Sequence, residues 1–166
     1  SQELKILRSM LKQGLNTPQT SSVGRLFDAI AALVGLSKTV SFEGEAAMQF
    51  EFAINGEETT ATYPIKVVST TENTPLILDW EPMVRSILAD LKHQQPLSHI
   101  AAKFHNTLIA SITKIAQQIS TSTVVVTGGC FQNQYLLENT IFTAQHNQLH
   151  PYWCQQLPPN DGGIAF

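Results

Sequence analysis

The stretch VVVTGGCFQN, residues 124–133, restricts the fold more than any other part of the chain. Its β-branched run predicts a short buried strand, because such side chains fit a pleated surface. The run stops at Gly128 and Gly129 and continues in polar residues that a helix accepts. A chain turns this sharply from strand to helix when its backbone must stay open to an approaching group, which is most often a phosphate.

The residues after this turn continue the alternation of strand and helix. A helix is expected over residues 133–145 and a strand over 149–153, and DGGIAF at 161–166 reads as the start of a further helix. Strands that are apolar without alternating, and that are separated by helices, favour parallel pairing and right-handed crossovers. Residues 61–166 are therefore predicted to be α/β.

Residues 1–60 are predicted to be mainly helical, because their apolar residues recur at helical spacing. We expect helices over residues 3–13, with Gly14 as the stop; from a cap at Ser21 or Ser22 to Gly35; and over residues 42–54, closed by Asn55 and Gly56.

The middle of the chain mixes both kinds of element. Residues 62–70 and 75–80 read as a hairpin or a pair of edge strands around a polar turn. Asp79 is expected to cap a helix that runs to about Leu91, and Ser98 a longer one that follows.

Size and charge exclude several classes of protein. The 166 residues suit one domain, or one lobe of a larger enzyme. No apolar run approaches the ~20 residues of a membrane helix, and no secretion signal is visible, so a cytoplasmic location is expected. The net charge is −3 and the ten basic residues are scattered, which argues against a nucleic-acid surface but leaves small nucleotides open.

The glycine pair is the first candidate site. Backbone amides at Gly128 and Gly129 can reach an anion, and valine at position 129 would block them and resist an unusual backbone conformation. A ligand-free tight turn explains the same residues equally well. Asn133 can cap the following helix or hydrogen-bond a ribose.

The sequence PPNDGG, residues 158–163, is the second candidate. Asp161 can bind a metal, orient a hydroxyl or cap a helix, and capping is the commonest of these roles. Arg25 and Asp28 are spaced for a salt bridge, although a nucleotide contact fits as well.

Other reactive residue types receive no chemical role. The five histidines show no metal-binding spacing. Cys130 and Cys154 are expected to be small buried hydrophobic residues, and no histidine near Cys130 supports a nucleophile.

Four stretches in order, TSSVGRLFDAIAALVG, FEGEAAMQFE, TGGCFQNQYLLE and PPNDGGIAF, closely resemble the C-terminal end of the HypF family of hydrogenase-maturation carbamoyltransferases. The family has serine and valine where this chain has Thr127 and Cys130. The resemblance implies one lobe of the actin-like ATPase and sugar-kinase (ASKHA) fold, here the second half of the family's last module. The chain would thus be a piece of a protein several times longer.

The resemblance also implies a function. Family members make carbamoyl-adenylate from carbamoyl phosphate and ATP in a YrdC-like domain. The last module then passes the carbamoyl group to a C-terminal cysteine of the HypE partner, and the product becomes the cyanide ligand of a nickel–iron site. This chain alone is expected to be inactive, since it lacks the adenylate-forming domain and a nucleophile of its own.

By the same resemblance, the nucleotide would lie on a small set of residues. Gly128 and Gly129 would hold its phosphates, while Asn133 and the region from Ser21 to Gly24 would flank adenosine. Asp161 would bind a divalent metal whose histidine ligands lie outside this chain.

Two rival interpretations stay open. One is a non-catalytic interaction module whose glycines only form turns. The other is a sugar-kinase-like phosphotransferase lobe, which would share the fold.

Overall fold

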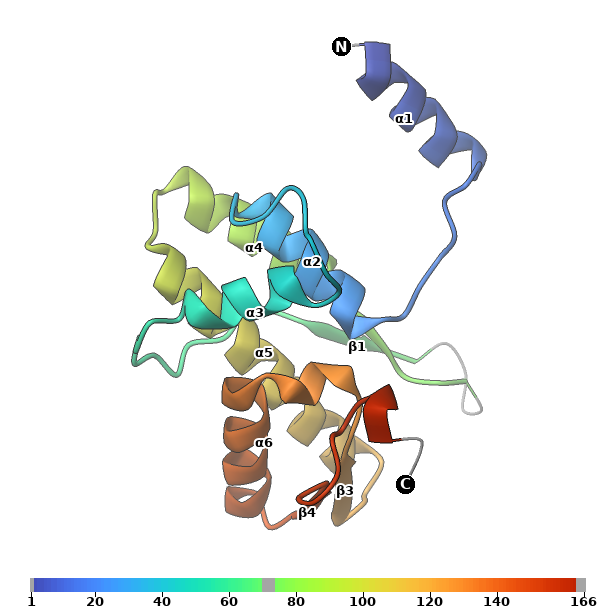
Figure 1. Cartoon of the computed structure of the whole chain (residues 1–166). Helices are drawn as coiled ribbons and strands as arrows, with labels where there is room; N and C mark the ends of the chain where they lie inside the picture. The colour runs from blue at the N-terminus through green and yellow to red at the C-terminus, as the bar shows by residue number, and fades with distance from the viewer. Residues whose placement is uncertain (1, 70–73, 164–166) are drawn as a thin grey trace.

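A long helix, α5 (Leu97–Gln118), is the axis of the fold in the computed structural model, which describes residues 2–69 and 74–163. Three shorter helices, α2 (Val23–Leu33), α3 (Glu45–Phe52) and α4 (Glu81–Lys92), surround its first half (Figure 1). Their apolar faces form one core cluster with α5. The predicted helical stripes are therefore the buried surfaces of this layer.

The centre of this core is aromatic. Phe27 of α2 meets Phe104 of α5 edge-on, with ring centroids 5.0 Å apart, and Phe50 of α3 lies 5.3 Å from Phe104. All three rings are almost fully buried. Edge-to-face packing of this kind adds to the gain from burial, so the position of α2 relative to α5 is well determined.

The second half of α5 carries a parallel strand–helix–strand unit. Strand β3 (Thr123–Val126) pairs with β4 (His150–Trp153), with Thr123 opposite His150 and Val126 opposite Trp153, and α6 (Gln134–His146) connects the two. This confirms the predicted parallel pairing. A second small sheet joins β1 (Lys66–Val68) and β2 (Ile77–Asp79) antiparallel, as a hairpin requires.

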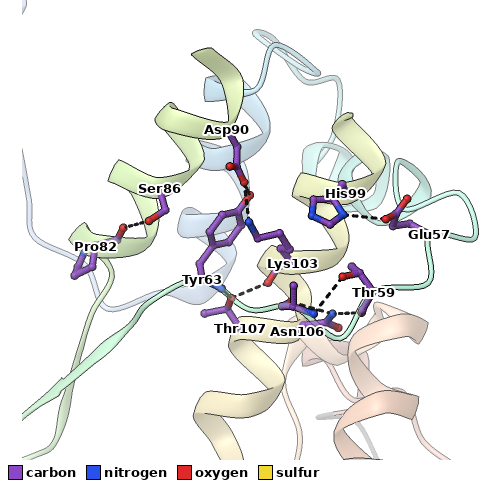
Figure 2. A network of polar contacts seen from close by, with 11 residues as sticks. Glu57, Thr59, Tyr63, Pro82, Ser86, Asp90, His99, Lys103, Asn106 and Thr107 are labelled. Carbon is purple, nitrogen blue, oxygen red and sulfur yellow. Dashed lines mark hydrogen bonds and ion pairs between the residues drawn. The ribbon is translucent and has the colours of Figure 1, made fainter. Parts of the chain in front are cut away.

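The extended segment before β1 is bound to α4 and α5 by polar contacts (Figure 2). The Tyr63 amide donates to Thr107 Oγ1 at 2.7 Å, and the Tyr63 hydroxyl donates to Asp90 Oδ2 at 2.8 Å. Lys103 Nζ donates to the same Asp90 oxygen at 2.8 Å and lies 4.1 Å from the centroid of the Tyr63 ring. Burial acts to raise the pKa of Asp90, but the bonds from Lys103 and Tyr63 outweigh it and hold that pKa below its ordinary value.

Several predicted helix boundaries were wrong. The third helix begins at Glu45 instead of residue 42, because Gly44 has φ +86° and cannot belong to it. Ser98 does not cap α5, which follows Pro96; its hydroxyl hydrogen-bonds Glu57 instead. Asp79 accepts from the Glu81 amide, but the capping position itself is Trp80.

Two expectations near the end of the chain also need correction. Cys154 is exposed, so it is no buried hydrophobic residue, although both cysteines are free thiols. The helix expected at residues 161–166 is a single 3-10 turn, η2 (Asp161–Gly163), as far as the structure describes it; residues 164–166 lie outside the described part.

Helix α1 (Gln2–Gln13) forms where the leucine spacing predicts it but has no buried residue, and it stands away from the other helices (Figure 1). Within residues 2–69 and 74–163, no helix combines the length and apolarity needed to cross a membrane.

Candidate functional site

The two glycine motifs meet in the folded chain. The Gly128 amide, at the end of β3, donates to the Pro159 carbonyl in the loop after β4, at 2.7 Å. Parallel strands end at the same edge of a sheet, and ligands of α/β proteins bind beside that edge. The sequence PPNDGG therefore lies against the turn after Gly128.

A cavity of about 470 Å³ opens beside this junction. Four segments supply its walls: the start of α2, the residues before α3, the turn after β3, and the loop before η2. Its lining residues are Ser22, Gly24, Arg25, Asp28, Glu43, Gly44, Ala47, Gly129, Cys130, Gln132, Asn160 and Asp161. A volume of this size suits part of a small-molecule ligand.

The turn after β3 differs from the predicted one. Gly129 opens a 3-10 turn, η1 (Gly129–Gln132), and α6 begins only at Gln134. The glycines therefore do not present the amino terminus of α6 to a ligand. They present the amides of η1.

Two of those amides remain open. The Phe131 amide donates to Gly128 O and the Asn133 amide to Cys130 O. The amides of Gly129 and Cys130 have no hydrogen-bond partner within the described part of the chain. Both residues line the cavity, so donors are available there for an acceptor ligand.

The unusual backbone conformation belongs to Gly128, not to Gly129 as expected. Gly128 has φ +100° and ψ 159°, a region that is nearly restricted to glycine. At Gly129 an added Cβ would meet nothing closer than Gln132 Nε2, at 3.8 Å. Gly128 is therefore needed for the turn itself, while Gly129 leaves open space.

Charge in the cavity is mainly negative. Arg25 makes the predicted salt bridge with Asp28, at 3.3 Å, and a second one with Glu43, at 3.6 Å. With Asp161 the walls carry three carboxylates and one guanidinium. A bare phosphate is disfavoured beside these acids, so an anionic ligand should arrive with a cation.

Cys130 packs as predicted. It lies against the main core cluster, and burial, with Asp28 as a second cause, raises the pKa of its thiol. A raised pKa leaves the thiol protonated at neutral pH, so Cys130 is no nucleophile.

Asn133 caps α6, since its Oδ1 accepts from the Leu136 amide at 2.7 Å. Its Nδ2 lies 2.9 Å from Nε2 of the buried His105, whose Nδ1 is 2.8 Å from the Ala101 carbonyl. This geometry makes Nδ1 the protonated nitrogen of His105. The carboxamide of Asn133 makes one bond at each end within the fold, and the residue is buried, so its observed role is structural.

Asp161 has an exposed side chain at the start of η2. The helix-capping bond comes from its neighbour, because Asn160 Oδ1 accepts from the Gly162 amide at 3.0 Å. Among the described residues no three His, Cys, Asp or Glu side chains are grouped as a metal would require. The described residues therefore do not by themselves make a complete metal site.

Only some of the predicted site residues line the cavity. Gly24, Gly129 and Asp161 line it; Ser21, Gly128 and Asn133 do not. The cap of α2 is Ser22, whose Oγ accepts from the Arg25 amide at 3.3 Å.

Four lining residues were not predicted as part of a site: Glu43, Gly44, Ala47 and Gln132. A glycine within an expected helix, as at Gly44, was the available signal for a local break.

Comparison with known proteins agrees with this architecture. Over residues 1–166 the chain matches the family described as "Carbamoyltransferase, Kae1-like Domain, second subdomain". It is 42% identical over 162 residues to carbamoyltransferase HypF of Synechocystis sp., covering 98% of this chain and 20% of that protein. With carbamoyltransferase HypF of Rhizobium leguminosarum bv. viciae the identity is 34% over 164 residues, which cover 96% of this chain and 20% of that protein.

Solved structures extend the comparison. Full-length HypF, crystallised in a phosphate- and nucleotide-bound form, is similar with a TM-score of 0.92 and 36% identity, covering 99% of this chain and 22% of that one. HypF of T. kodakarensis shares the fold, with a TM-score of 0.80 and 23% identity over 98% of this chain and 21% of that chain. The chain thus spans about a fifth of the length of these relatives.

Proposed function

Because the chain belongs to the HypF carbamoyltransferase family, as the second subdomain of its Kae1-like domain, we propose that it forms one half of a nucleotide-dependent carbamoyl-transfer site. The complete protein would move a carbamoyl group from carbamoyl-adenylate, made from carbamoyl phosphate and ATP, to the C-terminal cysteine of a HypE partner. This chain would hold the nucleotide part of the donor.

The observation that carries this proposal is the meeting of the two glycine motifs. The bond from Gly128 to Pro159 sets η1 and Asp161 on one cavity, and the Gly129 and Cys130 amides there are free to donate. Backbone donors fixed in place before the reaction stabilise charge on phosphate and carbamoyl oxygens without reorganising.

The attacking group would come from the partner. Cys130 is held as a neutral thiol, and Cys154, although exposed, does not line the cavity. Transfer forms the bond between the carbamoyl carbon and the partner's cysteine sulfur, and breaks the bond between that carbon and the phosphate oxygen of the adenylate. The partner's cysteine releases its proton to solvent, and AMP leaves with the oxygen.

The proposal extends to the surroundings of the site. The mixed α/β fold would be one lobe of an ASKHA fold, and the protein would work in the cytoplasm. Asp161 would supply one ligand to a divalent metal that takes its other ligands from parts of the protein outside this chain, since catalytic metals usually need about three.

The Asp161→Ala substitution in the complete protein tests this proposal. We expect loss of bound metal and of carbamoyl transfer, measured by metal analysis and by mass spectrometry of the partner cysteine. Adenylate formation should survive, because it belongs to another domain. Glu138→Ala, which removes an exposed carboxylate on α6, serves as the control.

Unchanged metal content and unchanged carbamoyl transfer in Asp161→Ala would show that this residue has only a structural role in its turn. Loss of adenylate formation as well would show that the two half-reactions are divided differently between the domains.

A further inference from the structure

Helix α1 is an amphipathic element whose apolar side is exposed in the described part of the chain. Ile6, Leu7 and Leu11 are 54%, 54% and 69% exposed, and no residue of α1 is buried. Figure 1 shows α1 apart from the core, joined to α2 only by an extended segment.

The two sides of α1 differ in character. At 100° per residue, Ile6, Met10, Leu7 and Leu11 fall on one side of the helix. Lys5, Arg8 and Lys12 fall on the opposite side together with Ser9, and both terminal glutamines lie near the boundary. Glu3 is the one charged residue on the apolar side. A helix of this pattern normally lays its apolar side on a protein surface.

Helix α1 is too short to be stable in water without packing against another surface. A helix of 12 residues is marginal in water, because its few hydrogen bonds barely repay the cost of nucleation. Packing of the apolar side must supply the remainder. We therefore expect α1 to be stabilised by a contact between its apolar side and another surface.

We propose that the apolar side of α1 docks on the first subdomain of the same Kae1-like domain. The family description makes this chain the second subdomain, so the domain contains another. The relatives are about five times longer, and the full-length HypF structure matches 99% of this chain at a TM-score of 0.92. The described arrangement is thus shared with a protein in which the rest of the polypeptide is present.

The connection to α2 limits where this docking surface lies. Residues 14–21 separate α1 from the cap Ser22, and eight extended residues reach at most about 30 Å. Ser22 and Gly24 line the cavity. Docking of α1 therefore ties the first subdomain to one wall of that cavity, whether or not the site transfers carbamoyl groups.

Hydrogen exchange tests this interface without reference to activity. In the polypeptide that carries both subdomains, we expect the α1 amides to exchange at least about tenfold more slowly than in the 166-residue chain alone. Replacing Leu7→Asp and Leu11→Asp together should remove that protection. The control, Lys5→Asp with Ser9→Asp, places two aspartates on the polar side and should leave the protection intact, although it changes the net charge by −3 rather than −2.

The 166-residue chain serves as the control for folding. Its melting temperature should not change with Leu7→Asp and Leu11→Asp, because both side chains are exposed in the described part of that chain. Equal exchange in the short and long polypeptides would overturn the proposal. So would protection that depends on protein concentration and coincides with dimerisation of the short chain, since a second copy would then be the partner.

Discussion

At the scale of single residues, two buried threonines on neighbouring helices have opposite hydrogen-bonding states. Thr140 Oγ1 on α6 is buried without a hydrogen-bond partner in the described part of the chain. Thr107 Oγ1 on α5 donates to the Lys103 carbonyl and accepts from the Tyr63 amide, each at 2.7 Å. Their hydroxyls should therefore contribute to stability with opposite signs.

We expect Thr140→Val to raise the free energy of unfolding by about 1 kcal/mol, since it removes an unsatisfied hydroxyl at nearly constant volume. Thr107→Val should lower it by about 1–3 kcal/mol, because the Tyr63 amide loses its acceptor. Urea unfolding of both variants measures the difference. Destabilisation by both would mean that Thr140 has a partner the structure does not show.

His105 makes stability depend on pH. Burial, opposed by the bond to Ala101, lowers its pKa from 6.5 to about 4. Between these pH values His105 binds a proton in the unfolded chain but stays neutral in the folded chain. Its contribution to the free energy of unfolding is therefore fully present above about pH 6.5 and falls as the pH drops toward 4. The loss is of the order of 3 kcal/mol.

Unfolding measured from pH 7 to 4 should show this decline, and His105→Gln should flatten it even if that variant is less stable overall. Asp90 acts in a separate window: its pKa is lowered, so its contribution persists above 3.8 and is lost below. An unchanged slope in His105→Gln would contradict a neutral buried imidazole.

At the scale of elements, the two glycines after β3 have separable roles. Gly128→Ala should cost about 1–3 kcal/mol of stability, because the backbone of an alanine is strained at φ +100°. Gly129→Ala should change stability by less than about 0.5 kcal/mol, since its Cβ meets open space. Chemical denaturation of the pair measures both, and equal losses would contradict the described turn.

Sequence pattern was sufficient for the type of some elements but not for their burial. The valine run of β3 and the leucine spacing of α1 each predicted the right kind of element. The expected burial of β3 was wrong, since Val125 is 68% exposed and only Val126 is buried. The 3-10 turn η1 could not be predicted, since it depends on the Gly128 bond to Pro159, a residue far along the chain. Ser98 was misread as a cap because a polar residue at a helix start can equally bond a distant partner, here Glu57.

At the scale of the whole molecule, the candidate site is assembled from four segments that are distant in sequence. Glu43 meets Arg25 only because α2 and α3 pack together, and Asp161 reaches the cavity only because β3 and β4 pair. Local patterns identified Gly129 and Asp161 as separate candidates. They could not show that both line one cavity, because that follows from tertiary packing.

Calorimetric titration of the 166-residue chain with magnesium and ATP tests the central claim, that this cavity holds a nucleotide, most directly. We predict weak but measurable binding, weaker still without magnesium because carboxylates line the cavity. Binding should vanish in Gly129→Val, which fills the space beside the free amides, and persist in Ala61→Val, which places a valine at an exposed site. No heat at millimolar nucleotide, or equal binding by a folded Gly129→Val variant, would show that the glycines only form a turn.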